Sequence, residues 1–234
     1  MTDNIYSRTA ALLGDAAIDR LKSARVAVFG AGGVGSAAIE ALSRSGVGCI
    51  DIFDHDTISP TNLNRQLMTH SQNIGESKAK AAAERARLIN PEAAVTAHEI
   101  FYLPDTADSV DLSQYDYIID AVDTLTAKLL LAEKAKEANT PIISCMGTGN
   151  KLDITRLRVS DIKKTEMCPL ARRMRKELKE RGIDELLCVW SDEKPDSAKD
   201  TGELKGDRPA PASAVFVPAA AGLIMAKEVI TALI

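Results

Sequence analysis

Closely spaced cysteines are missing from this sequence. The four cysteines stand far apart, and no two form a Cys-x-x-Cys pair: Cys49, Cys145, Cys168 and Cys188. Structural zinc sites usually need such pairs, and cytosolic cysteines rarely form disulfides. The three histidines also lack metal-ligand spacing: His55, His70 and His98. We therefore expect no zinc site and no disulfide, and we interpret each histidine as structural.

Segments that would send the chain to a membrane are also missing. The N-terminus is polar and has no apolar signal stretch. The longest uncharged apolar run, residues 214–226, is too short to span a bilayer and is interrupted by Pro218. It predicts a buried closing helix at roughly 218–233. We expect a cytoplasmic protein with no membrane span.

A net positive charge is missing too, since the 234 residues carry a formal charge of −4. That balance argues against indiscriminate binding to nucleic acid. The distribution is uneven, because residues 151–181 hold eleven Lys and Arg against five Asp and Glu, a local net of +6. The rest of the chain must then carry −10. The segment is either a surface for a polyanion or a solvated helix face.

What is present is an alternation of strands and helices through the first 150 residues. Short apolar runs predict strands at 25–30, 49–54, 94–100, 115–123 and 141–145. Longer periodic segments predict helices at 33–45, 75–89 and 124–138. Such alternation indicates βαβ units. The expected fold class is α/β, a Rossmann-like mostly parallel sheet with helices on both faces.

The last third departs from this pattern. Residues 152–162 alternate apolar and polar side chains, which is typical of a half-exposed antiparallel strand. Residues 169–181 predict a basic helix, and 191–211, rich in Asp, Lys, Gly and Pro, predicts a mobile loop. No convincing linker separates these parts. We predict a nucleotide-binding core at 1–150 and an appended elaboration of the same domain at 151–234.

A glycine-rich turn, GAGGVG, follows the first predicted strand. Its glycines are Gly30, Gly32, Gly33 and Gly35. They allow a tight turn, close approach of the backbone to phosphate, and packing of the next helix on the strand. Asp54 ends the second strand about twenty residues on, where a carboxylate would accept hydrogen bonds from ribose hydroxyls. This context predicts a nucleotide site, and a turn kept for packing alone is the alternative.

The turn is not a Walker P-loop, because Gly35 is followed by Ser36 and Ala37 instead of Lys and Ser or Thr. Cations for a triphosphate must come from elsewhere, and Arg65 and Lys78 in the following polar loop can supply them. NAD needs no such pair. An α-phosphate under attack does, because negative charge grows on it in the transition state. We therefore expect ATP as the cofactor.

Asp123 stands just past the end of the fourth predicted strand, where ligands bind in an open α/β sheet. A carboxylate there can hold magnesium, and a helix N-cap is the alternative. An NAD(P)-binding oxidoreductase would leave Arg65, Lys78 and Asp123 without a role. A non-catalytic nucleotide-binding scaffold would not need the complete polar set.

The motifs GAGGVG, DHDTISPTNLNRQ, GESKAK and DAVDT, in this order, resemble adenylating domains of the ThiF/MoeB/HesA type, relatives of the ubiquitin-activating enzymes. The resemblance covers roughly residues 6–150. It implies that Gly33 faces the nucleotide, that Asp54 holds the ribose, and that Asn62, Arg65 and Lys78 contact the phosphates.

The same resemblance implies that Asp123 is the catalytic, magnesium-linked aspartate. Arg8, in YSRTAALLG, matches an arginine that family members reach across a dimer interface into the partner's ATP site. A homodimer is therefore expected. The zinc cysteines of ThiF and MoeB have no counterpart here, which is where this chain departs from those members.

The stretches KTEMCPLARRMRKELKERGI and SAVFVPAAAGLIMAKEVI resemble a branch without those cysteines, the tRNA threonylcarbamoyladenosine dehydratases (TcdA, also called CsdL). The resemblance implies that ATP activates the carboxylate of threonylcarbamoyladenosine beside the anticodon, which then cyclises with loss of water. Ring closure within one side chain is entropically favoured. It needs no enzyme nucleophile, and the sequence has no convincing Cys–His or Ser–His arrangement.

Two features of the basic segment complete the hypothesis. In the helix at 169–181, Leu170, Met174 and Leu178 should face the core. The candidate tRNA-binding side chains would then face solvent: Arg172, Arg173, Lys176 and Lys179.

Cys168 lies among cations and could form a thioester or persulfide link, with a cysteine-desulfurase or sulfur-acceptor system as partner. Packing at the helix start is the interpretation we favour. The alternative function is activation of a small ubiquitin-like sulfur-carrier protein, against which the missing zinc cysteines weigh.

Overall fold

The computed structural model describes residues 5–196, 202, 204–205 and 208–234. Its centre is a sheet of seven strands in the order β3-β2-β1-β4-β5-β7-β6. In chain order these are β1 (Arg25–Phe29), β2 (Cys49–Phe53), β3 (Ala94–His98), β4 (Tyr117–Asp120), β5 (Ile142–Cys145), β6 (Leu157–Asp161) and β7 (Leu187–Ser191). Only the edge strand β6 runs antiparallel to its neighbour within this sheet. The predicted Rossmann-like, mostly parallel sheet is confirmed.

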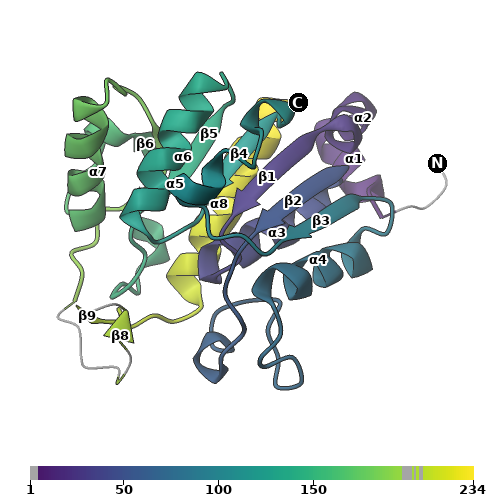
Figure 1. Cartoon of the computed structure of the whole chain (residues 1–234). Coiled ribbons are helices and arrows are strands. Elements are labelled where there is room, and N and C mark those ends of the chain that lie inside the picture. Colours follow the sequence, from purple (N-terminus) through teal and green to yellow (C-terminus); the bar gives the residue numbers. More distant parts are fainter. Residues whose placement is uncertain (1–4, 197–201, 203, 206–207) are drawn as a thin grey trace.

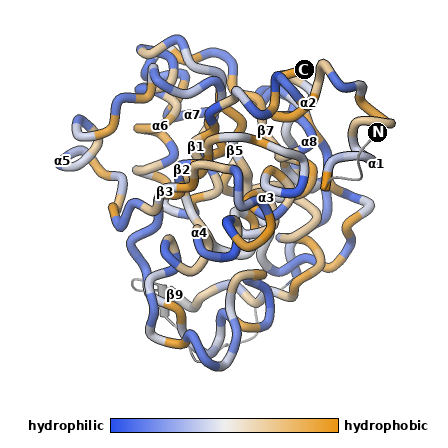
Figure 2. Tube along the Cα trace, turned by 90° about the vertical axis from the view of Figure 1, so that its right-hand side faces the viewer, coloured by the Kyte–Doolittle hydropathy of each residue, from blue (hydrophilic) through white to orange (hydrophobic). Residues whose placement is uncertain are grey.

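Helices cover both faces of the sheet (Figure 1). They are α1 (Ser7–Leu13), α2 (Asp15–Ser23), α3 (Gly33–Ser45), α4 (Lys78–Ile89), α5 (Pro104–Ala107), α6 (Leu125–Glu137), α7 (Pro169–Glu180) and α8 (Phe216–Leu233). The largest apolar cluster joins α3, α4 and α8 to one face, while two further clusters join α6 and α7 to the other. Hydrophobic segments accordingly run through the centre of the molecule and hydrophilic ones through its outer loops (Figure 2).

The strand order reverses between β1 and β4. Chain order runs outward from β1 to β2 and β3 on one side, and from β4 to β5 on the other. Phe29, the last residue of β1, pairs with Asp120, the last residue of β4. The loops that follow these two strands therefore leave the sheet side by side. Such a switch point is where open α/β sheets bind ligands.

The closing helix α8 packs tightly against α3. A Cβ built on Gly222 would lie 2.1 Å from the Val34 carbonyl oxygen, so only glycine permits this approach. Pro218 stands in the first turn, where its missing N–H has no intrahelical partner to lose. Within the described part of the chain, α8 alone is long and apolar enough to cross a membrane, judged by length and composition. Its contact with α3 is that of a core helix.

Several predicted boundaries differ from the structure. The helix predicted from residue 75 begins at Lys78, because Gly75 and Glu76 hydrogen-bond with Ile58 instead. The strand predicted at 152–162 begins at Leu157, after a 3₁₀ turn at Ile154–Arg156. The strand predicted to reach residue 100 ends at His98.

Three elements that contribute to the fold were not predicted from the sequence. Helices α1 and α2 precede the first strand, and β7 inserts between β5 and β6. The loop predicted at 191–211 falls partly outside the described residues, and within it Leu204–Lys205 pairs with Arg208–Pro209. Its mobility stays a prediction. The division at residue 150 also stays a prediction, although β6, β7 and α8 belong to the same sheet and core.

Candidate functional site

The glycines of the GAGGVG turn have two different roles. Gly30 has a φ of 89°, and a Cβ on it would lie 2.8 Å from the Ala121 carbonyl oxygen. A Cβ on Gly35 would lie 1.7 Å from the Gly30 carbonyl oxygen. Close packing of the backbone therefore requires glycine at positions 30 and 35. A Cβ on Gly32 would meet nothing within 4 Å, so the backbone there stays accessible at the start of α3. Amides at such a position attract anions.

Asp54 follows β2 and faces this turn. Its two carboxylate oxygens accept hydrogen bonds from the Ala31 amide at 2.7 Å and from the Asp56 amide at 2.9 Å. Burial raises the pKa of the Asp54 carboxyl above its ordinary value, and these amide bonds oppose the rise. The side chain is thus a partly buried acceptor beside the glycine turn. A hydroxyl donor could replace the water that burial removes.

The polar loop after Asp54 closes on itself and brings Lys78 to Asp56. The Lys78 amide donates to the Asp56 carbonyl at 3.0 Å, and Thr57 forms an antiparallel bridge with Ser77. Lys78 is only 7% exposed, and its ammonium lies 2.7 Å from the Asp56 carboxylate. An ammonium held in this way keeps a defined position next to the carboxyl end of β2.

Arg65 lies directly against the glycine turn. A Cβ on Gly33 would come within 3.3 Å of the Arg65 side-chain stem. The Arg65 guanidinium donates to the Thr61 carbonyl and to the Asn64 side chain, each at 2.9 Å. Asn62 is buried and its side-chain oxygen accepts the Ser59 amide at 3.0 Å. Its amide nitrogen is the group that could donate to a phosphate.

Asp123 lies in the loop between β4 and α6, on the other side of the switch point from Asp54. Its side chain is exposed. The N-cap of α6 is Thr124, so Asp123 does not occupy the N-cap position that was its alternative interpretation. The structure therefore gathers the glycine turn, Arg65 and Asp123 around the carboxyl ends of β1 and β4.

Arg8 is not brought to this site within one chain. It lies exposed on α1, and Tyr6, two residues before it, lies against Gly46 at the far end of α3. The 13 residues of α3 separate that end from the glycine turn. At 1.5 Å per residue, this amounts to about 20 Å.

Residues Asp54, His55 and Asp56 form a cluster that the sequence analysis did not predict. Their possible ligand atoms all lie within 4.8 Å of one another. Two of the three already have strong partners, since Asp56 holds Lys78 and Asp54 accepts two amides. The His55 ring stacks on Phe101 with centroids 3.9 Å apart. The cluster thus belongs to the polar rim of the same site.

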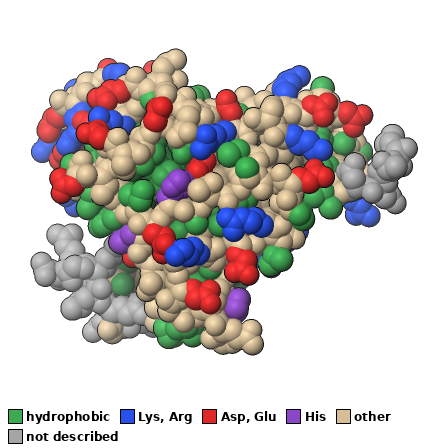
Figure 3. Space-filling model, turned by 45° about the vertical axis from the view of Figure 1, so that its right-hand side comes forward, with side chains coloured by type: hydrophobic (Ala, Val, Ile, Leu, Met, Phe, Trp, Pro, Cys, Tyr) green, Lys and Arg blue, Asp and Glu red, His purple; other side chains and the backbone are tan. Residues whose placement is uncertain are grey.

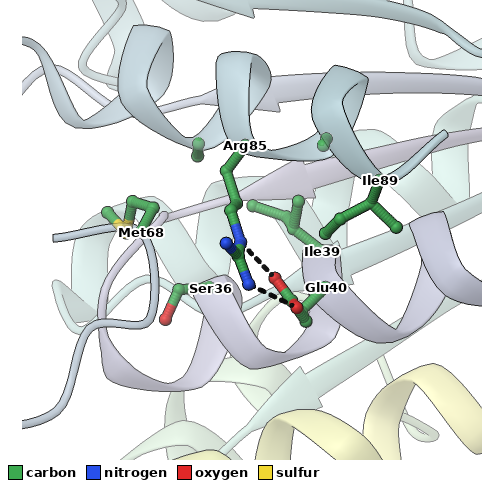
Figure 4. A pocket seen from close by; sticks show the side chains of 8 residues that line it. Ser36, Ile39, Glu40, Met68, Arg85 and Ile89 are labelled. Carbon is green, nitrogen blue, oxygen red and sulfur yellow. Dashed lines mark hydrogen bonds and ion pairs between the residues drawn. The ribbon is translucent and has the colours of Figure 1, made fainter. Parts of the chain in front are cut away.

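A small pocket lies next to the site, and side chains fill most of it. It lies between α3 and α4 and has a volume of about 10 Å³. Figure 4 shows Arg85 reaching across it to Glu40, and the two form hydrogen bonds of 3.0 Å. Ser36, at its rim, accepts the Leu67 amide at 3.1 Å and ties the polar loop to α3. The pocket serves packing and leaves no room for a ligand.

Helix α7 has the two faces that its sequence predicts. Met174 and Leu178 are buried, and Leu170 is partly buried against the same cluster. The four candidate tRNA-binding side chains are exposed: Arg172, Arg173, Lys176 and Lys179. Cys168 is buried at the N-cap position, and a Cβ on Gly147 would lie 3.7 Å from its sulfur. Packing of this thiol is what the structure shows.

One buried ion pair was not predicted from the sequence. Asp120, at the end of β4, and Lys128, in α6, are completely buried and paired at 2.9 Å. The available signal was a lysine within the apolar stretch LTAKLLL, where helical spacing would place it on the buried face.

Comparison with known proteins identifies the family of this chain. The ThiF family model matches residues 6–234. A Bacillus subtilis protein named tRNA threonylcarbamoyladenosine dehydratase is 39% identical over 96% of this chain and 92% of its own length. The Escherichia coli protein of the same name is 39% identical over 74% of this chain and 65% of its own.

Solved structures show the same relationship. The E. coli dehydratase TcdA in complex with ATP superposes with a TM-score of 0.88 and 33% identity, over 97% of this chain and 93% of that one. E. coli MccB with ATP shares the fold alone, with a TM-score of 0.70 and 21% identity. The family expected from the sequence motifs is thereby confirmed: this chain belongs to the ThiF family and is similar to proteins named tRNA threonylcarbamoyladenosine dehydratase.

Proposed function

We propose that the protein is an ATP-dependent dehydratase that adenylates the carboxylate of threonylcarbamoyladenosine in tRNA and promotes its cyclisation. The observation that carries this proposal is the match to named dehydratases over nearly the whole chain. The site geometry supports the chemistry, because an accessible glycine turn, two cations and two carboxylates converge on one end of the sheet.

Each side chain has a part in holding ATP. Gly32 and Gly33 let the phosphates approach the start of α3, and the Asp54 carboxylate accepts from the ribose. Arg65 and Lys78 balance the charge that grows on the α-phosphate, with Asn62 donating beside them. The carboxylate of Asp123 is a hard oxygen ligand of the kind magnesium prefers. Magnesium would neutralise phosphate oxygens when bound there.

The reaction then divides into two displacements. A carboxylate oxygen of the substrate attacks the α-phosphorus, and pyrophosphate leaves. A nucleophilic atom of the same modified side chain next attacks the acyl carbon of the mixed anhydride. AMP leaves with the carboxylate oxygen that the substrate loses, the ring closes, and the proton of the attacking group passes to solvent. The protein orients the two reactants and excludes water, and the second step is favoured because it is intramolecular.

The reaction itself provides the direct test. The purified protein is incubated with ATP, magnesium and bulk tRNA, and the digested nucleosides are weighed by mass spectrometry. We expect threonylcarbamoyladenosine to lose the mass of one water. Parallel incubations without ATP, and with NAD in its place, should leave it unchanged. Turnover with NAD alone would favour an oxidoreductase, and unchanged nucleoside with ATP would refute the proposal.

Three broader expectations belong to the same proposal. A homodimer would let Arg8 act at the partner's ATP site, since α1 lies at the far end of α3 from the glycine turn of its own chain. A cytoplasmic location suits a tRNA substrate, and we expect no membrane span. A sulfur-relay partner stays a prediction, and the buried position of Cys168 argues for packing rather than covalent chemistry.

The tRNA should dock on α7. This helix begins next to Gly147, which follows β5, so its N-terminal turns lie at the same edge of the sheet as the ATP site. A groove of about 410 Å³ runs along it, with Lys163, Arg172 and Lys179 among its lining residues. On the face seen in Figure 3, basic and acidic side chains are intermixed. The exposed cations of α7 are our candidates for contacts with tRNA phosphates.

Reversing the charges of Arg172, Arg173 and Lys176 to Glu should weaken tRNA binding strongly and flatten its salt dependence. Backbone phosphate contacts release counterions, so the slope of affinity against salt scales with the cations engaged. ATP binding should hardly change. The measurement is a tRNA titration at several salt concentrations.

The matched control reverses Lys22, Lys134 and Lys227 to Glu. These three lie on other elements, with Lys22 and Lys227 exposed and Lys134 half-buried, and their reversal changes the net charge equally. Equal loss of affinity in both triple variants would indicate a general charge effect. Unchanged affinity in the α7 variant would identify that face as merely solvated.

A further inference from the structure

Three buried polar side chains connect the ends of β4 and β5 with α6. We name Asp120, Lys128 and Ser144 the buried triad; each is 0% exposed. The Lys128 ammonium lies 2.9 Å from the Asp120 carboxylate and 3.1 Å from the Ser144 hydroxyl. The Ser144 hydroxyl donates to the same carboxylate oxygen at 2.5 Å. Nothing in the proposed chemistry uses these groups directly.

Stability alone is a weak reason for such an arrangement. The free energy lost by removing two charges from water is often larger than the free energy gained from their attraction. Well-packed apolar residues frequently replace buried ion pairs without loss of stability. A buried pair is therefore informative when it holds something else in place.

The loop that carries Asp123 depends on the Asp120 carboxylate. The second carboxylate oxygen of Asp120 accepts the Val122 amide at 3.2 Å. The preceding Ala121 amide donates to the Phe29 carbonyl at 2.8 Å, and Ala121 packs on Gly30 so closely that no side chain fits there.

On the other side of Asp123, the Lys128 amide donates to the Thr124 carbonyl at 3.1 Å. The loop is thus attached to the triad at both ends, through Asp120 before it and Lys128 after it. The same lysine that balances the Asp120 charge also belongs to the first hydrogen-bonded turn of α6.

We propose that Asp120 is a positioning residue, which sets the place of Asp123 by holding the Val122 amide, and that Lys128 balances its buried charge. This inference rests on the catalytic role proposed for Asp123. One Asp120 oxygen meets the Lys128 ammonium and the Ser144 hydroxyl, and the other meets the loop, so the two charges can be removed together while the contact with Val122 is kept. Asp123 then reaches the nucleotide from a backbone that does not need to reorganise.

Two double variants separate this role from simple packing. Both replace Lys128 by Met and so remove the buried charges. Asp120→Asn in the first retains an oxygen for the Val122 amide and an NH₂ group for Ser144. Asp120→Val in the second has a similar volume and no acceptor. Pyrophosphate release and ATP affinity are measured for both and for the wild type.

We expect unchanged ATP affinity in both double variants and a kcat that separates them. The Asp120→Asn/Lys128→Met enzyme should keep most of its kcat. The Asp120→Val/Lys128→Met enzyme should lose roughly a hundredfold, the scale of a misplaced reacting group. Equal kcat values in the two variants, whether high or low, would overturn the proposal. A wild type without tRNA-dependent pyrophosphate release would instead refute the proposed function.

Hydrogen exchange in the wild type covers the case in which the valine variant does not fold. The Val122 amide is partly buried and donates to Asp120, so it should exchange far more slowly than an exposed, unbonded loop amide. Exchange at the rate of an exposed loop amide would overturn the proposal without any variant.

Discussion

Replacing Lys78 by Ala should lower the rate of adenylation by a factor on the order of a hundred or more, the scale expected for one lost electrostatic contact to a transition state. The same loss is expected for Asp123→Ala. Tight ATP binding would persist in part, because Arg65 and the glycine turn remain. Pyrophosphate release with saturating tRNA is the measurement.

The fold should survive both substitutions. Removing Lys78 leaves Asp56 without its cation, yet the Asp56 side chain is 51% exposed and stays hydrated. Asp123 is exposed as well. Circular dichroism and thermal unfolding should therefore resemble those of the wild type.

Lys80 provides the matched control. It lies on the same helix two residues from Lys78, but it is exposed and pairs with Glu99 away from Asp56. Lys80→Ala should keep nearly full activity. If Lys78→Ala turned over as fast as Lys80→Ala, the phosphate role assigned to Lys78 would be wrong.

Mixing two inactive variants, Arg8→Ala and Asp123→Ala, should restore activity. Tyr6, two residues before Arg8, lies at Gly46, and the length of α3, about 20 Å, separates Gly46 from the glycine turn. Arg8 can act at an ATP site only if a partner subunit presents it, and a two-fold dimer would do so reciprocally. Each hybrid dimer would then contain one site with both wild-type groups and one with neither.

Subunit exchange must be demonstrated first, for instance by mixing tagged and untagged chains and capturing the hybrids. Each variant measured alone gives the baseline. Activity that stays at this baseline in proven hybrids would remove the role in trans. A monomeric protein in solution would remove it as well.

Local features of the fold and the site were predictable from the sequence. The apolar run at Arg25–Phe29 followed by GAGGVG predicts a buried strand and a turn, because both depend on neighbouring residues. The faces of α7 were predictable for the same reason, since helical periodicity alone separates Met174 from Arg173. Their positions on the molecule were not.

Features that depend on distant segments were predicted poorly. The strand β7 is a short apolar run beside a polar segment, and only its insertion between β5 and β6 identifies it. Its neighbour in the sheet, β5, lies more than forty positions earlier in the chain. The partner of Lys78 was missed as well, because Asp56 meets it only when the polar loop closes.

The sequence by itself determined the parallel α/β class, the glycine turn, the cations available to a nucleotide, and the family. These follow from residue type and short-range spacing, which act through local backbone preferences and periodic burial. Only the tertiary structure decided that Arg8 lies far from the turn, and that Asp120 and Lys128 meet beside the loop of Asp123. Those relations arise when the strand order and helix packing bring remote segments together, and burial then forces each polar group to find a partner.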